Sequence, residues 1–180
     1  MKVEGTKPLA LDSGKLGPGD WIRMMGLVPL PGEGGWFRET FRSSYASGNL
    51  PPAFCNGPHV LGTAIYYMLG PGEKSIPHRI PGDEIYHFYA GSPVTLLILE
   101  NGTEGREVRL GSPLESGCVP QILVPKGAWQ ASRVEDPKGW ALLGTTVFPG
   151  FEFSEWEKGD IGRLKKLFPL WVEALDTFEE

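Results

Sequence analysis

The chain has 180 residues, of which 41% are hydrophobic and 22% are charged, and its formal net charge is −5 at pH 7. These values are typical of one globular domain and exclude a disordered chain. Lysine and arginine occur in no run longer than the pair Lys165 and Lys166, so the sequence predicts no nucleic-acid partner.

The sequence also predicts no membrane partner. Its longest aliphatic run, Val94–Leu99, is far shorter than the approximately 20 residues that a membrane-spanning helix needs. The N-terminal residues contain no apolar core of a signal peptide, and the two cysteines have no motif spacing that would indicate a disulfide framework or a zinc knuckle. We therefore expect a cytoplasmic protein.

The sequence predicts a flexible N-terminal segment, residues 1–19, followed by a single domain, residues 20–180. Asp20 has the position of a helix cap before a short helix that ends near Gly26. The segments rich in β-branched and aromatic residues are predicted strands, at residues 36–43, 60–69, 84–90, 94–100, 106–110, 121–124, 128–134 and 140–148. Short strands in this number indicate a sandwich or a barrel.

Helical patterns return near the C-terminus. Ser154 and Glu157 have the spacing of a capping box, and the helical pattern that follows continues as far as Pro169. Residues 170–178 are predicted to form a further short helix.

Two segments, residues 72–91 and 125–130, carry the residues most suited to chemistry. They resemble the two cupin motifs, which run Gly, five residues, His-x-His, three or four residues, Glu, six residues, Gly, and then Pro-x-Gly-x-x-His. The positions that match are Gly72, His78, Glu84, Gly91, Pro125 and Gly127. Alternate residues on a strand share one face, so such motifs can direct several ligands into the lumen of a barrel.

The chain departs from these motifs at two positions. Ile80 stands where the second histidine of the pair belongs, and Gln130 stands where the histidine of the second motif belongs. His78, Glu84 and Gln130 then offer one imidazole, one carboxylate and one amide, a poor ligand set for zinc or iron. We therefore expect no cofactor. The alternative is a divalent metal (manganese, iron, nickel or zinc) bound by these three residues. His87 lies three residues after Glu84, so it is expected to face the opposite side of its strand.

A wider resemblance covers residues 20–169. The strings EGGWFRETFRS, TAIYYML, HRIPGDEIYHFYAGSP, VPKGAWQAS and TTVFPGFEFSEWE look like the cupin-5 family. The resemblance implies an all-β fold, the cupin double-stranded β-helix or jelly-roll barrel, with short N-terminal and C-terminal helices. It also implies a homodimer, and much of the family is catalogued as a domain of unknown function.

Several other residues are candidates for the pocket. Glu84 interrupts an apolar and aromatic strand, where a buried carboxylate needs a partner or a pocket. Tyr86 and Trp129 are typical core residues, but Tyr86 could donate a proton and Trp129 could contact a ligand. Arg38 belongs to a solvated face or, if it points inward, binds an anionic ligand.

Two functional hypotheses remain open. In the first, the barrel binds a small polar molecule, such as a sugar or a sugar nucleotide, and acts as a metal-free isomerase or epimerase. The resemblance to deoxysugar epimerases implies His78 as the base, oriented by Asp83 or Glu84. It also implies a nearby tyrosine, such as Tyr86, as the acid and Arg38 as the anion anchor. In the second, the pocket is a non-catalytic ligand sensor or a weak metal site.

A homodimer is also expected on physical grounds. An open jelly roll has edge strands that must be covered, and the apolar strand at 94–99 would promote aggregation at an uncovered edge.

Overall fold

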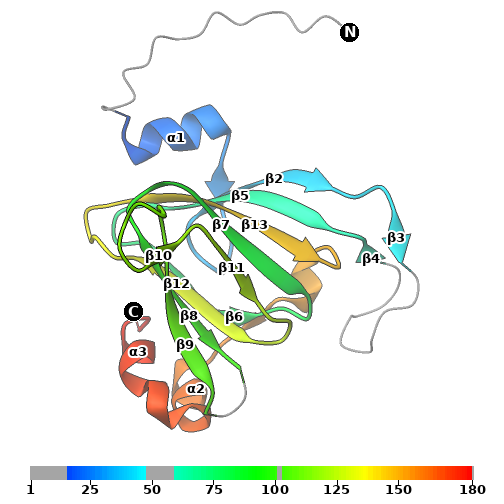
Figure 1. The fold of residues 1–180 in the computed structure, drawn as a ribbon. Coiled ribbons are helices and arrows are strands. Elements are labelled where there is room, and N and C mark those ends of the chain that lie inside the picture. Colours follow the sequence, from blue (N-terminus) through cyan, green and yellow to red (C-terminus); the bar gives the residue numbers. More distant parts are fainter. Residues whose placement is uncertain (1–15, 48–58, 101–102, 180) are drawn as a thin grey trace, which may run out of the picture.

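A computed structural model describes residues 16–47, 59–100 and 103–179. Two six-stranded sheets pack face to face (Figure 1). In spatial order, the first sheet contains β1 (Val28–Pro29), β2 (Trp36–Arg42), β5 (Thr63–Leu69), β13 (Ala141–Phe148), β7 (Asp83–Gly91) and β11 (Gln121–Val124). The second sheet contains β10 (Cys118–Val119), β9 (Gly105–Leu110), β8 (Val94–Leu99), β12 (Trp129–Val134), β6 (Lys74–Arg79) and β14 (Glu157–Lys158). The expected all-β jelly roll is confirmed.

The core between the sheets follows from alternation along the strands. Inward residues of the first sheet, such as Tyr67, Tyr86 and Leu143, pack against Leu96 and Ile98 of the second. The intervening residues of β5 and β7 face outward. A short pair, β3 (Ala46–Ser47) with β4 (His59–Val60), extends beside the barrel.

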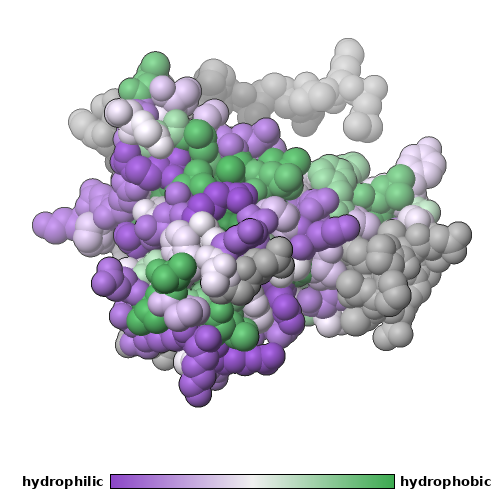
Figure 2. Space-filling model, turned by 60° about the horizontal axis from the view of Figure 1, so that its bottom comes forward, coloured by the Kyte–Doolittle hydropathy of each residue, from purple (hydrophilic) through white to green (hydrophobic). Residues whose placement is uncertain are grey.

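Helices cover part of each outer face. The helix α1 (Pro18–Met25) lies on the first sheet, where Trp21 contacts Trp140 with ring centroids 5.7 Å apart. The helices α2 (Ile161–Leu167) and α3 (Val172–Asp176), joined by the 3₁₀ turn Pro169–Trp171, pack on the second sheet. Figure 2 shows hydrophilic residues between separate hydrophobic areas on the face that it displays.

The apolar strand β8 is not an edge strand. It lies between β9 and β12, and all six of its residues are buried. On its outer side, Leu97 and Leu99 pack with Leu164, Phe168 and Leu175 of the C-terminal segment. The strand therefore does not lie at an uncovered edge, and the edge argument gives no support to a homodimer.

Both terminal helices differ from the expectation in where they start. The helix α1 begins at Pro18 because Gly17 is the N-cap, and Asp20 accepts a hydrogen bond from the Gly17 amide at 3.0 Å. The cap of α2 is Asp160, which accepts from the Arg163 amide at 2.7 Å, so the prediction of Ser154 as a cap was wrong. Ser154 lies in the 3₁₀ turn Phe153–Glu155 instead. Most of the expected flexible segment, residues 1–19, lies outside the described residues.

One strand that positions the site was missed. The strand β6 pairs with β12 and β14. It was not predicted because it contains Pro77, which lacks an amide hydrogen and is more typical of a loop. The pairing of β6 with β12 shifts register between Gln130 and Ser132, and such irregularities accommodate a residue that does not fit the regular ladder. Within the described ranges, no helix is long and apolar enough to span a membrane.

Candidate functional site

A pocket of about 70 Å³ lies between the two sheets. Its wall is mostly apolar, with a small number of charged side chains. It is lined by Leu30, Glu33, Phe37, Glu39, Arg42, Thr63, Ala64, Ile65, Tyr67, His78, Ile80, Glu84, Tyr86, Thr145, Val147, Phe151 and Phe153. An apolar pocket with a few converging polar groups is the usual form of a small-molecule site.

His78 is fixed in the wall of this pocket. It is buried on β6, and its ring stacks on Trp156 with centroids 5.9 Å apart. Its Nδ1 lies 2.8 Å from the carbonyl oxygen of Ile76. A carbonyl can only accept, so Nδ1 carries the hydrogen and Nε2 is the basic atom of the neutral ring. That Nε2 lies 3.7 Å from a carboxylate oxygen of Glu33.

Glu33 is the pocket residue that the sequence did not point to. The hydroxyl of Ser75 donates to its carboxylate at 2.9 Å, and the Ile76 amide donates to its backbone carbonyl at 3.0 Å. Gly34 and Gly35 let this loop press against the strands: a Cβ on Gly34 would lie 2.3 Å from the Lys74 carbonyl oxygen. The available signal was a lone glutamate among glycines in the segment 31–35.

Glu84 enters the pocket from β7 and is buried. Burial raises the pKa of its carboxyl, and the nearby Glu33 carboxylate raises that pKa further. His78, Gln130 and Thr145 act in the opposite direction. Gln130 stands directly across from His78 in the β12–β6 pairing and donates its amide to Glu84 at 2.6 Å. The structure thus brings His78, Glu84 and Gln130 together, with Gln130 behind the carboxylate.

Two tyrosines complete the polar part of the wall. The hydroxyl of Tyr67 donates to the Gly34 carbonyl at 3.0 Å and so holds the Glu33 loop in place. Tyr86 is buried, and desolvation, reinforced by the charges of Glu84 and Glu33, raises the pKa of its hydroxyl well above the ordinary value. Tyr86 therefore keeps its proton and can act as a hydrogen-bond donor.

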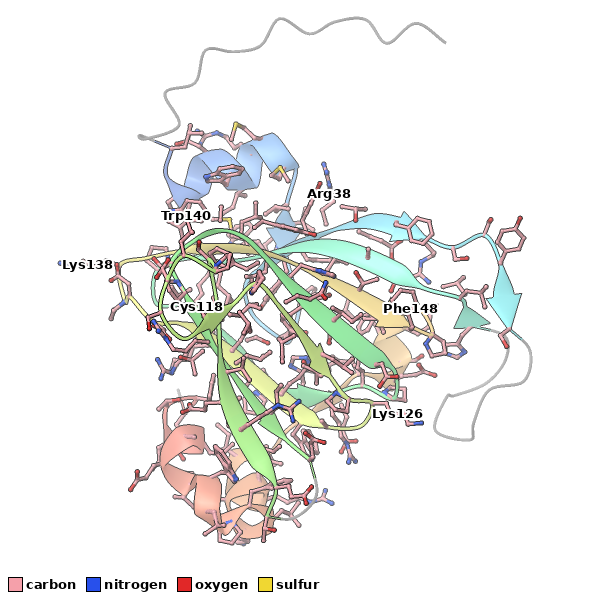
Figure 3. The ribbon with its side chains drawn as sticks, in the orientation of Figure 1. Arg38, Cys118, Lys126, Lys138, Trp140 and Phe148 are labelled. Carbon is pink, nitrogen blue, oxygen red and sulfur yellow. The ribbon has the colours of Figure 1, made fainter. Side chains whose placement is uncertain are left out.

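Arg38 and Trp129 do not line the pocket. Arg38 is exposed on the outer face of the first sheet beside α1, with its guanidinium 5.4 Å from the ring centroid of Tyr66 (Figure 3). Trp129 packs on the outer side of the second sheet with the C-terminal helices, and Arg79 lies over its ring at 4.5 Å. The inward position considered for Arg38 is not adopted, because Arg38 follows the inward Phe37 and pairs with the outward Tyr66. A register shift between Glu39 and Phe41 brings Arg42 to the pocket.

The other two histidines have distinct places. His87 faces away from the pocket, as its spacing from Glu84 predicted, and its Nε2 lies 3.0 Å from the Thr146 hydroxyl. His59 is buried, and its Nε2 lies 2.8 Å from a Glu155 carboxylate oxygen.

The donor set does not fit a resident divalent metal. Ile80 contributes an apolar side chain to the pocket where the motif would place a second imidazole. Gln130 turns its amide nitrogen, which is not a metal ligand, toward Glu84. Over residues 16–47, 59–100 and 103–179, no cluster of three or more His, Cys, Asp or Glu side chains has the arrangement of a metal site.

Comparisons with known proteins agree with the fold. A family model described as Cupin superfamily (DUF985) matches residues 19–158. The uncharacterized protein YML079W of Saccharomyces cerevisiae is 29% identical over 137 residues, which cover 68% of this chain and 66% of the yeast protein, just under two thirds of its length.

Two solved structures are similar over nearly the whole chain. Protein SO0799 from Shewanella oneidensis has 30% identity and a TM-score of 0.78, with 92% of this chain and 98% of that chain covered. A hypothetical protein from Leishmania major has 26% identity and a TM-score of 0.79, with 91% and 98% covered.

Proposed function

The chain belongs to the DUF985 family of the cupin superfamily, and on that premise we propose that its pocket binds a small polar organic molecule and transfers a proton on it without a metal. The observation that carries the proposal is the buried His78 ring. Its Nδ1 is held by the Ile76 carbonyl, which leaves Nε2 as the basic atom next to Glu33. A fixed tautomer that presents the lone pair of Nε2 to the pocket is the arrangement that a general base requires, and the nearby Glu33 carboxylate stabilises the imidazolium that forms.

The chemistry that suits this arrangement is isomerisation or epimerisation next to a carbonyl group. The Nε2 of His78 takes the proton from the adjacent carbon, and the C–H electron pair becomes the double bond of an enolate. The enolate oxygen accepts a hydrogen bond from Tyr86, whose raised pKa keeps it protonated. Return of the proton to the other face of the same carbon completes an epimerisation. Return to the neighbouring carbon, with transfer of the hydroxyl proton from one oxygen to the other, completes an isomerisation, and neither reaction changes the atoms of the compound.

Deuterium exchange tests the proposal on a panel of candidate substrates. The protein is incubated in D₂O with a series of hydroxyketones and aldoses, and loss of the proton next to the carbonyl is followed by ¹H NMR. We expect the wild type to accelerate exchange for at least one compound and the variant His78→Ala to fall to the buffer rate. His87→Ala is the matched control, because His87 faces away from the pocket, and it should exchange like the wild type.

Three outcomes would contradict the proposal. Equal exchange by His78→Ala and the wild type would remove His78 as the base. Near-stoichiometric manganese, iron, nickel or zinc in protein purified without a chelator or a His tag would favour the metal-site alternative. A compound that binds in the pocket and exchanges only at the buffer rate would support the non-catalytic ligand sensor.

A further inference from the structure

The wall of the pocket offers more hydrogen-bond acceptors than donors. Glu33 and Glu84 supply carboxylate oxygens, and the Nε2 of His78 is a third acceptor while its ring is neutral. The donors that remain on this wall are the hydroxyls of Tyr86 and Thr63, since the Tyr67 hydroxyl already donates to Gly34 and the Thr145 hydroxyl bonds Glu84. Such a wall suits a ligand that brings its own donors, such as a compound with several hydroxyl groups.

The guanidinium group on the wall is already engaged. The Nε of Arg42 donates to Glu39 at 3.1 Å and its Nη2 donates to the same carboxylate at 2.9 Å, while Nη1 donates to Glu152 at 2.8 Å. The Phe151 carbonyl accepts a further bond from Nη2 at 3.2 Å. Two carboxylates therefore neutralise Arg42, and its forked face is not available to a phosphate or a carboxylate of a ligand.

The size of the pocket also favours a small ligand. Its volume of about 70 Å³ lies well below the roughly 300–1,000 Å³ of sites that hold drug-sized ligands. A nucleotide-linked sugar is itself of that larger size. The aromatic part of the wall, where the Phe151 and Phe153 rings meet at 4.9 Å between centroids and Phe37 contacts Phe153, can pack against the carbon skeleton of a small hydroxylated compound.

From these observations we propose that the ligand is a small uncharged hydroxylated carbonyl compound, and that phosphorylated, nucleotide-linked and carboxylate-bearing analogues are excluded. The inference rests on the proposed function of the same pocket. An anion placed there would lose its hydration next to the carboxylates of Glu33 and Glu84 and find no free cation among the described wall residues in return.

Matched pairs of ligands test this selectivity. Dihydroxyacetone is compared with dihydroxyacetone phosphate, and glyceraldehyde with glyceraldehyde 3-phosphate, by titration of the wild-type protein with NMR detection of the histidine ring signals. We expect the neutral member of at least one pair to bind at least about tenfold more tightly and to shift the His78 signals. Tighter binding of the phosphorylated members, with the same His78 shifts, would overturn the charge selectivity but leave the proposed function standing.

Failure of the proposed function gives a different result. If neither member of any pair shifts the His78 signals, and no compound in the deuterium-exchange panel is exchanged faster than in buffer, then the pocket is not the reactive site and both proposals are overturned.

The variant Glu39→Gln tests the role of Arg42 directly. It replaces a carboxylate that Arg42 contacts through Nε and Nη2 by a neutral amide of the same shape. We expect the preference for the neutral member of a pair to fall at least about fivefold, because the freed guanidinium can then attract the phosphate. Glu107→Gln, on the exposed part of β9, should keep the wild-type preference. An unchanged preference in Glu39→Gln would contradict the proposed basis of selectivity.

Discussion

Glu84 is the residue whose environment most clearly conflicts with its charge. Burial, with a further contribution from Glu33, raises the pKa of the Glu84 carboxyl in the folded state. The folded protein therefore binds this proton more tightly than the unfolded chain does. The contribution of Glu84 to stability is fully present below its unfolded pKa, near 4.5, and is lost as the pH rises through the raised folded value.

The variant Glu84→Gln should remove this loss of stability at rising pH. The amide oxygen that it introduces can still accept from Gln130, while the buried charge disappears. We expect the free energy of unfolding at pH 7 to increase by on the order of 1 kcal/mol, and its decline between about pH 4 and pH 7 to become shallower. Urea unfolding at a series of pH values measures both quantities.

The matched control for this prediction is Glu107→Gln, which changes an exposed glutamate on β9. It should leave the pH dependence as in the wild type. A Glu84→Gln protein that is less stable than the wild type at pH 7 and keeps the wild-type slope would show that the Glu84 charge is better satisfied than its burial implies.

At the scale of elements, the loop between β1 and β2 decides where Glu33 lies. Gly35 has φ 72°, and a Cβ there would lie 2.6 Å from the Met68 carbonyl oxygen. Gly72 has almost the same φ, 73°, but no atom lies within 4 Å of the Cβ position. Both glycines therefore need a left-handed backbone conformation, but only Gly35 lies close against a neighbouring strand.

Alanine at each position separates these two effects. We expect Gly72→Ala to cost about 1 kcal/mol of unfolding free energy from the left-handed backbone alone. Gly35→Ala should cost about 1–3 kcal/mol more because of the added contact with β5. It should also shift the His78 ring signals, since Glu33 moves with the loop. Chemical denaturation and histidine NMR measure the two effects, and equal costs for the two variants would contradict the close approach of the loop.

The same elements show what the sequence could predict. Strands such as β5 and β13 were found because segments rich in β-branched and aromatic residues, bounded by turn residues, leave a direct trace in the sequence. The spacing within residues 72–91 also led us to expect His78 and Glu84 near one another, and both line the pocket, because alternate residues of adjoining strands face the same side. Both predictions depend on local geometry.

The missed features depend on contacts between distant segments. Glu33 reaches His78 only because the loop docks on β6, 42 residues away at the Ser75 contact. Arg42 rather than Arg38 faces the pocket because of a register shift in the β2–β5 pairing, and no residue type at that point indicates the shift. Trp129, a typical core residue that was also considered as a ligand contact, packs in a separate cluster with the C-terminal helices.

At the scale of the whole molecule, the outer face of the first sheet is only partly covered. The helix α1 packs over the region around Met68 and Leu142. Beyond it, the same face exposes large hydrophobic side chains from several strands. They are Phe41 of β2, Tyr89 of β7, Leu123 of β11 and Phe148 of β13, with 47–56% of their surface exposed. Phe148 is visible at the end of its strand in Figure 3. Side chains of this kind gathered on one face favour association.

We expect this face to form a homodimer, as the resemblance to dimeric cupins implied. Light scattering coupled to size-exclusion chromatography should give a mass near twice 19.7 kDa at micromolar concentration. Leu123→Asp should shift the mass toward the monomer, because a charge in the centre of an apolar interface loses its hydration without a partner. Leu114→Asp is the control, since Leu114 is 95% exposed in the segment between β9 and β10. A monomeric wild type would contradict the dimer, and a dimer that survives Leu123→Asp would place the interface on another face.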